Sequence, residues 1–278
     1  MNPFSITLNS GHDMPTLGLG TWPLTDAEAE SAVGSGIEAG YRQIDTAARY
    51  QNEDAVGRGI AASGLPRAEL FVTTKLRGSA HGEVRAAVEG SLAALGLDYV
   101  DLYLIHWPLP RLQLYPAAFE TMAELVDEGL IRSIGVSNFQ AGHIEHLIAV
   151  TGLTPAVNQI ELDPTIQRRA LRETLTGRGI VTQAWSPLGR GGPLLQHPTV
   201  LAAAQQAACT VGQVVLRWHR AQGIVPVVKS ADPARQRENL EVLSLPPLDP
   251  AIISALDGLD AEDAGEGRIR DSNTYEEF

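Results

Sequence analysis

The 278-residue sequence predicts an α/β fold, namely a (β/α)8 TIM barrel with an N-terminal β-hairpin. Eight short apolar segments recur along the chain, and most of them are rich in Val, Ile and Leu and lack the polar alternation of a half-exposed sheet. Amphipathic helical patterns separate consecutive segments, and about 250 residues is a common length for one such barrel. Because no linker or change in composition divides the chain, we expect a single domain over residues 1–278.

The strands follow one another at regular intervals. The expected hairpin spans Phe4–Pro15, with the turn residues Asn9-Ser10-Gly11 at its centre. The eight barrel strands are expected at Thr16–Gly20, Tyr41–Ile44, Leu70–Thr74, Tyr99–Ile105, Ile131–Val136, Ala156–Ile160, Ile180–Ala184 and Ile224–Val228.

Capping residues mark the helices between these strands. Thr25 and Glu28 have the spacing of a capping box, and Gly40 is typical of a helix end. A further helix is expected from near Asn52, and another where apolar residues repeat before Gly96. The Asp-Pro pairs at 232–233 and 249–250 place a capping side chain before a proline at the first helical position.

Composition excludes several classes of protein. The 33 acidic residues against 21 Lys and Arg give a net charge of −12, which disfavours partners such as nucleic acids or anionic membranes. A hydrophobic content of 44% excludes wholesale disorder. The single cysteine, Cys209, cannot form an internal disulfide, and we expect it to be a buried apolar residue within a helix. With no signal peptide or membrane-spanning apolar run visible, we expect a cytoplasmic protein. We also expect it to be monomeric.

Polar or aromatic residues stand at the ends of seven consecutive predicted strands. In a barrel of this kind, catalytic groups lie at the carboxyl ends of the strands, where the following loops converge. The residues at these positions are Asp45, Lys75, His106, Ser137-Asn138, Gln159, Trp185 and Lys229-Ser230. The sequence therefore predicts a functional rim at one end of the barrel.

The motif that follows the second strand is specific. Residues 40–53 read Gly-Tyr-Arg-Gln-Ile-Asp-Thr-Ala-Ala-Arg-Tyr-Gln-Asn-Glu. Further motifs follow in order: Thr73-Thr74-Lys75, Leu104-Ile105-His106-Trp107-Pro108, Ile134-Gly135-Val136-Ser137-Asn138-Phe139, Asn158-Gln159 and Trp185-Ser186-Pro187-Leu188-Gly189. With these motifs, residues 5 to about 257 resemble the aldo-keto reductase superfamily. Trp185 replaces the Tyr of most members, as in the bacterial branch that includes 2,5-diketo-gluconate reductases.

The resemblance implies an NADP-dependent oxidoreductase that reduces aldehydes or ketones to alcohols. Its catalytic residues would be Asp45, Tyr50, Lys75 and His106, with Tyr50 as the proton donor. We expect the Lys75 ammonium to lower the pKa of Tyr50, and His106 to donate a hydrogen bond to the substrate oxygen. Trp22 and Trp107, together with Tyr50 and His106, would line the pocket for a small carbonyl substrate, whose identity the sequence does not indicate.

The resemblance also implies NADPH/NADP+ as cofactor, with NADH possible but weaker. A helix capped by Asp232 begins beside Lys229 and Ser230, and its positive end together with Arg235 suits a phosphate. The expected cofactor-binding residues are Gly20, Thr21, Ser137, Asn138, Gln159, Trp185, Ser186, Leu188, Lys229, Ser230, Arg235, Glu238 and Asn239. Val228 stands where many members have proline, which puts the local backbone path in question.

Two further patterns resemble functional motifs, but we expect neither to bind a nucleotide or a metal. Gly57-Arg58-Gly59-Ile60-Ala61-Ala62 resembles a dinucleotide fingerprint but lies inside a helical pattern rather than at a strand-to-helix turn. His143-Ile144-Glu145-His146 lacks the companions of a metal site, so we expect a solvated helix face and no metal.

Two other classes of function stay open. One is a non-catalytic NADP(H)-binding sensor or scaffold, and the other is a phosphate-binding aldolase or isomerase barrel with a Schiff-base lysine or an acidic base. The C-terminal tail, with Arg268, Arg270 and Asn273, matches no pattern, so whether it closes over the substrate is also open.

Overall fold

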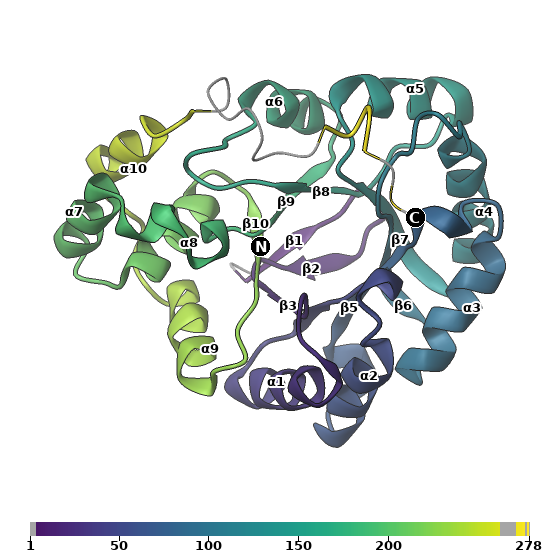
Figure 1. The fold of residues 1–278 in the computed structure, drawn as a ribbon, viewed down its shortest axis with the longest axis horizontal. Coiled ribbons are helices and arrows are strands. Elements are labelled where there is room, and N and C mark those ends of the chain that lie inside the picture. The colour runs from purple at the N-terminus through teal and green to yellow at the C-terminus, as the bar shows by residue number, and fades with distance from the viewer. Residues whose placement is uncertain (1–3, 262–270, 276, 278) are drawn as a thin grey trace.

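A computed structural model describes residues 4–261, 271–275 and 277 of the chain, and in these residues eight parallel strands form a closed barrel surrounded by helices (Figure 1). The strands follow the order β10-β3-β4-β5-β6-β7-β8-β9 around the barrel. Their bounds are β3 Gly18–Gly20, β4 Gln43–Asp45, β5 Phe71–Leu76, β6 Val100–Ile105, β7 Ile131–Ser137, β8 Val157–Glu161, β9 Val181–Trp185 and β10 Val225–Val228. Each of the eight predicted strands overlaps one of these, so the predicted barrel is confirmed.

The N-terminal hairpin covers one end of the barrel. Strands β1 (Ser5–Thr7) and β2 (Asp13–Pro15) pair antiparallel, and Figure 1 shows them across the centre of the ring of barrel strands. Leu8 and Met14 pack with residues from inside the barrel in a small apolar cluster whose other members are Phe71, Leu102, Leu104, Ala156, Val157 and Val225. The hairpin therefore closes the end of the barrel where β5, β6, β8 and β10 begin, and leaves the carboxyl ends of the strands for the site.

Where the sequence offers a capping signal, a helix begins or ends at that residue. The bounds are α1 Asp26–Ala39, α2 Glu53–Ala62, α3 Val84–Leu95, α4 Tyr115–Asp127, α5 Ala141–Thr151, α6 Arg169–Gly177, α7 Pro198–Gln206, α8 Val211–Ala221, α9 Pro233–Leu240 and α10 Pro250–Asp257. At the start of α1, the backbone N–H and hydroxyl of Thr25 donate to the Glu28 carboxylate at 3.1 and 2.8 Å. Asp232 and Asp249 accept the backbone N–H two residues on, at 2.8 and 2.7 Å, which satisfies donors that a helix start leaves unpaired.

The glycines of the Gly-x-Gly pattern in α2 serve helix packing. A Cβ at Gly57 would lie 2.3 Å from the carbonyl oxygen of Leu95, and one at Gly59 would lie 2.7 Å from that of Glu30. Only glycine permits such close approach of α2 to the neighbouring helices α3 and α1. The pattern therefore has a structural cause that involves no nucleotide.

Two expectations about single residues were wrong. Cys209 is half-buried in the turn between α7 and α8 rather than within a helix, because α7 ends at Gln206. His143 is buried rather than solvated, since its ring packs against Tyr115 and Phe139 and its Nδ1 accepts the backbone N–H of Gln140 at 3.2 Å. Within the described part of the chain, no group of three or more His, Cys, Asp or Glu could hold a metal ion.

Hydropathy gives only a weak signal for a membrane span. In the ranges that the structure describes, no single helix has the length and apolarity needed to cross a bilayer. The pair α7 and α8, bent by 85°, passes that test only when the two helices are taken together.

Candidate active site

A cleft of about 1330 Å³ opens at the carboxyl ends of the barrel strands. It brings together nearly all the residues that the sequence predicted for the site. The predicted residues that line it are Gly20, Thr21, Trp22, Asp45, Tyr50, His106, Trp107, Ser137, Asn138, Gln159, Trp185, Ser186, Leu188, Lys229, Ser230, Arg235, Glu238 and Asn239. Lys75 is the exception, because it is fully buried in the barrel wall behind Asp45 and Tyr50.

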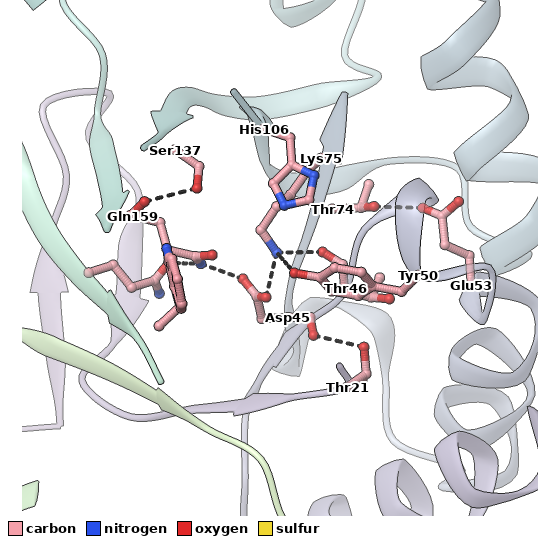
Figure 2. Close-up of polar contacts among 12 residues, drawn as sticks. Thr21, Asp45, Thr46, Tyr50, Glu53, Thr74, Lys75, His106, Ser137 and Gln159 are labelled. Atoms are coloured by element: carbon pink, nitrogen blue, oxygen red, sulfur yellow. Dashed lines mark hydrogen bonds and ion pairs between the residues drawn. The ribbon is translucent and has the colours of Figure 1, made fainter. Parts of the chain in front are cut away.

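A buried ion pair forms the centre of the site (Figure 2). Lys75 on β5 donates from Nζ to Oδ1 of Asp45, at the end of β4, at 2.6 Å and to the carbonyl oxygen of Thr46 at 2.7 Å. Its third contact is with the Tyr50 hydroxyl at 3.4 Å. Burial alone would lower the pKa of Lys75, but the charge of Asp45 and these contacts raise it above its ordinary value. Lys75 is therefore charged at neutral pH.

The pKa of Tyr50 is raised, so Tyr50 keeps its proton at neutral pH, as a proton donor must. It follows β4 in a single 3-10 turn, Ala48–Tyr50, which directs its hydroxyl to Lys75. Burial raises the pKa of Tyr50, and the Lys75 charge, which acts in the opposite direction, does not outweigh it. Lys75 therefore acts on this pKa in the expected direction, but desolvation of the phenolate is the larger effect and the net shift is upward.

His106 stands at the end of β6, edge-on to Tyr50. The two ring centroids lie 5.8 Å apart, and Figure 2 shows one ring nitrogen of His106 directed to the Tyr50 hydroxyl. Asn138 donates to the backbone carbonyl oxygen of His106 at 3.0 Å, which ties the end of β6 to the end of β7. Tyr50 and His106 thus present two polar atoms to one region of the cleft.

Four side chains expected to bind the cofactor form a continuous hydrogen-bond network. Asn138 has a φ of 63°, in the left-handed region that asparagine tolerates, and its Oδ1 accepts from the indole Nε1 of Trp185 at 2.9 Å. Ser137 donates to the backbone carbonyl oxygen of Gln159 at 2.8 Å, and Gln159 donates to Oδ2 of Asp45 at 2.7 Å. This network connects the wall of the cleft to the Asp45–Lys75 pair.

The far end of the cleft carries two exposed cations. Lys229 and Arg235 are exposed there, beside the first turn of α9, and 72% of the Arg235 side chain is accessible. Arg235 donates to the capping residue Asp232 at 3.3 Å, an exposed contact that a stronger ligand can replace. The path of β10 is regular through Val228, which pairs with Leu19 of β3, so the missing proline does not disturb it.

Sequence reasoning missed several residues of the cleft. Glu161 ends β8 directly after the predicted strand, so the rule of polar strand ends could have found it. Arg190 lies 3.6 Å from Glu161, with its guanidinium 5.6 Å from the ring centroids of both Trp22 and Trp185. Two others, Tyr275 and Glu277, come from the C-terminal tail, for which no sequence signal exists.

The tail approaches the site through these two residues. The Tyr275 ring lies 4.4 Å from that of Trp107, and Glu277 Oε1 lies 2.8 Å from Nδ1 of His106. Arg268 and Arg270, which the sequence singled out, lie outside the described residues, whereas Asn273 donates to Asp271 in a turn of the tail. Part of the tail therefore borders the cleft on the side of His106.

The fold and this cleft together define a barrel enzyme with its site at the carboxyl ends of the strands. A model of the aldo/keto reductase family matches residues 16–261. An aldo-keto reductase of Mycolicibacterium vanbaalenii is 49% identical over 258 residues, which are 92% of each chain. Methylglyoxal reductase DkgA of Escherichia coli is 45% identical over 242 residues, which are 87% of this chain and 88% of that protein.

Solved structures of similar proteins have the same fold as this chain. An aldo/keto reductase from Brucella melitensis is 43% identical, with a TM-score of 0.88 over 92% of this chain and 99% of that one. A mutant of Gox0644 in complex with NADPH is 38% identical, with a TM-score of 0.91 over 98% of both chains. This chain belongs to the aldo/keto reductase family and is an oxidoreductase, as the sequence motifs implied.

Proposed function

We propose that the protein reduces aldehydes and ketones to alcohols, with NADPH as hydride donor and Tyr50 as proton donor. The observation that supports this most is the position of the Tyr50 hydroxyl, 3.4 Å from the buried Lys75 ammonium and beside His106 in the cleft. A protonated phenol next to a fixed cation is an acid whose conjugate base is stabilised where it forms.

The residues of the cleft fit a dinucleotide that carries an extra phosphate. Lys229, Ser230 and Arg235 would hold the 2′-phosphate at the first turn of α9, with Glu238 and Asn239 beside the adenine. Ser137, Asn138 and Gln159 would hold the carboxamide against the face of Trp185, and the cleft wall at Gly20, Thr21, Ser186 and Leu188 would line the rest. When bound, the reduced nicotinamide supplies the hydride that no side chain can supply.

The protein's own side chains supply the proton and the electrostatic stabilisation. His106 Nε2 and the Tyr50 hydroxyl would both donate to the carbonyl oxygen, which polarises the C=O bond. As the carbonyl carbon accepts the hydride, Tyr50 transfers its proton to the oxygen, giving the alcohol and a phenolate. Lys75 stabilises that phenolate, and Asp45 and Thr46 hold the ammonium in place. Trp22 and Trp107 would border the substrate.

Among the two other classes of function, the charge of Lys75 argues against an aldolase. A Schiff-base lysine must lose its proton, whereas the pKa of Lys75 is raised and its amine is fully buried. A non-catalytic NADP(H)-binding sensor would not need the Tyr50–Lys75 contact.

The test is to mix the protein with NADPH and glyoxal-type or aromatic aldehydes and follow the absorbance of NADPH. Turnover is expected, faster with NADPH than with NADH. Binding of NADPH without turnover on any carbonyl would favour the sensor instead. A single domain over residues 1–278, a cytoplasmic location and a monomeric state stay predictions.

A further inference from the structure

A carboxylate from the C-terminal tail lies against the active-site histidine. Glu277, the penultimate residue, is 3% exposed, and its Oε1 lies 2.8 Å from Nδ1 of His106. Its Oε2 accepts the backbone N–H of Gly78, in the loop after β5, at 3.1 Å. The two oxygens are thus engaged by two different strand ends of the barrel.

The main chain of the tail is closely fitted at this point. A Cβ at Gly78 would lie 2.1 Å from the carbonyl oxygen of Glu277, so only glycine at position 78 leaves room for the tail. Two residues earlier, the Tyr275 ring packs on Trp107. The position of Glu277 is therefore supported by backbone and ring contacts besides those of its own carboxylate.

Glu277 is ionised at neutral pH. Burial acts to raise its pKa, but contact with His106, the Gly78 N–H and the charge of Arg49 together lower the pKa below its ordinary value. His81, also buried nearby, is neutral because burial lowers its pKa to about 4. Arg49 is a cation that faces the carboxylate, whereas Tyr50 is protonated and carries no charge.

An ionised carboxylate can only accept hydrogen bonds, so the His106 nitrogen that faces it must carry a proton. Figure 2 shows one ring nitrogen of His106 turned to the Tyr50 hydroxyl, and because Nδ1 faces Glu277, we take this nitrogen as Nε2. Nε2 can donate to a substrate oxygen only if it also carries a proton. A ring with a proton on each nitrogen is positively charged, and the negative carboxylate at Nδ1 balances that charge.

We propose that Glu277 is a positioning residue for His106, which orients the imidazole through Nδ1 so that Nε2–H points to the carbonyl oxygen of the substrate. This role rests on the reductase function proposed above. In this role Glu277, which borders the cleft, acts on the reaction through the histidine. The C-terminal tail thereby completes the catalytic arrangement with a residue that lies far from the family motifs in the sequence.

Kinetics of Glu277→Gln test this role. Removal of a carboxylate that orients a metal-binding histidine lowers activity about 10–100-fold, so we expect kcat of Glu277→Gln to fall about tenfold or more. The affinity for NADPH should not change, and Glu277→Asp should recover part of the lost kcat. The matched control is Glu38→Gln on α1, which removes the same charge from an exposed carboxylate and should keep the parent's kcat.

A double-mutant cycle separates action through His106 from any other effect. In a His106→Gln background, Glu277→Gln should lower kcat no further. A full tenfold loss in that background, or parent-like kcat for the single variant, would overturn the proposal.

A readout without turnover keeps the proposal distinct from the proposed function. Nitrogen-15 NMR of labelled histidine, assigned with His106→Gln, should show a proton on Nδ1 of His106 in the parent protein and a changed Nδ1 signal in Glu277→Gln. A His106 ring with no proton on Nδ1 in the parent would refute the contact even if the enzyme is active. If the parent reduces no carbonyl, the proposed function fails, while this spectrum still decides whether Glu277 positions the ring.

Discussion

Replacement of Lys75 by methionine should destabilise the fold as well as stop catalysis. The side chain is fully buried, and its Nζ contacts Asp45, Thr46 and Tyr50 within 3.4 Å. Methionine fills much of the same volume but leaves the Asp45 carboxylate with Gln159 as its remaining side-chain donor. Removing one partner of a buried ion pair costs about 3–5 kcal/mol, because the other charge stays in a poorly solvated site.

The loss is measurable by thermal unfolding. At about 2–4 °C per kcal/mol for a chain of this size, Tm should fall by about 10 °C. The folded state raises the pKa of Lys75 above its ordinary value of 10.5. The charged Lys75 therefore stabilises the fold fully below pH 10.5, and this stabilisation is lost only as the pH rises through the folded-state pKa. A measurement at neutral pH therefore samples the whole effect.

Two control variants make this prediction sharper. Arg85→Met removes a cation of the same kind of pair, with Glu128, on the exposed surface, and should leave Tm close to that of the parent. The double variant Asp45→Asn/Lys75→Met removes both charges and should regain much of the stability that Lys75→Met loses. If Lys75→Met melted no lower than Arg85→Met, the buried pair would not have the energetic role assigned to it.

Two further predictions concern the cofactor end and the helix packing. Arg235→Ala should weaken NADPH binding about ten- to a hundredfold, since a charged hydrogen bond contributes about 1.5–3 kcal/mol, and should barely alter NADH binding. Fluorescence titration at low and high salt checks this, and equal losses for both cofactors would place Arg235 elsewhere. Gly57→Ala should cost about 1–3 kcal/mol of unfolding free energy, because its Cβ would meet the Leu95 carbonyl oxygen. Gly90 is an exposed position in α3 with no atom within 4 Å of a new Cβ, so Gly90→Ala should instead stabilise the protein by about 0.5–1 kcal/mol. Urea unfolding measures both variants, and equal effects would contradict the packing role of Gly57.

The barrel was predictable because its strands are covered on both faces. A parallel strand inside a layer of helices is largely apolar, so segments such as Leu102–Ile105 and Val225–Val228 stand out in the sequence. The helices are marked by local chemistry, as Asp232 and Pro233 show, which needs no knowledge of tertiary contacts.

The cleft residues on strand ends were predictable for a related reason. The fold sends the residues after all barrel strands to the same rim, so chain order alone predicts that Asp45, Lys75 and His106 meet. The direction in which the pKa of Tyr50 shifts was not predictable in this way. It depends on how much protein surrounds the phenol, and that is a property of the packed structure rather than of neighbouring residues.

The contribution of the C-terminal tail could not be found from the sequence at all. Tyr275 and Glu277 belong to no strand, helix or repeating pattern, and Glu277 lies 171 positions from His106 in the chain. His143 was misplaced because aromatic rings from α4 and from the segment after β7 cover it, and the sequence does not show which helix faces a neighbouring element covers. Long-range contacts of irregular segments leave no periodic signal in a single sequence.

Steady-state turnover of Tyr50→Phe, measured beside its affinity for NADPH, tests the central claim most directly. Phenylalanine keeps the ring against His106 and removes only the hydroxyl that contacts Lys75. Loss of a general acid costs about 100- to 10,000-fold, so kcat should fall to about 1% of the parent value or less while NADPH binds as before. A Tyr50→Phe enzyme that reduces aldehydes at close to the parent rate would show that the proton comes from another group.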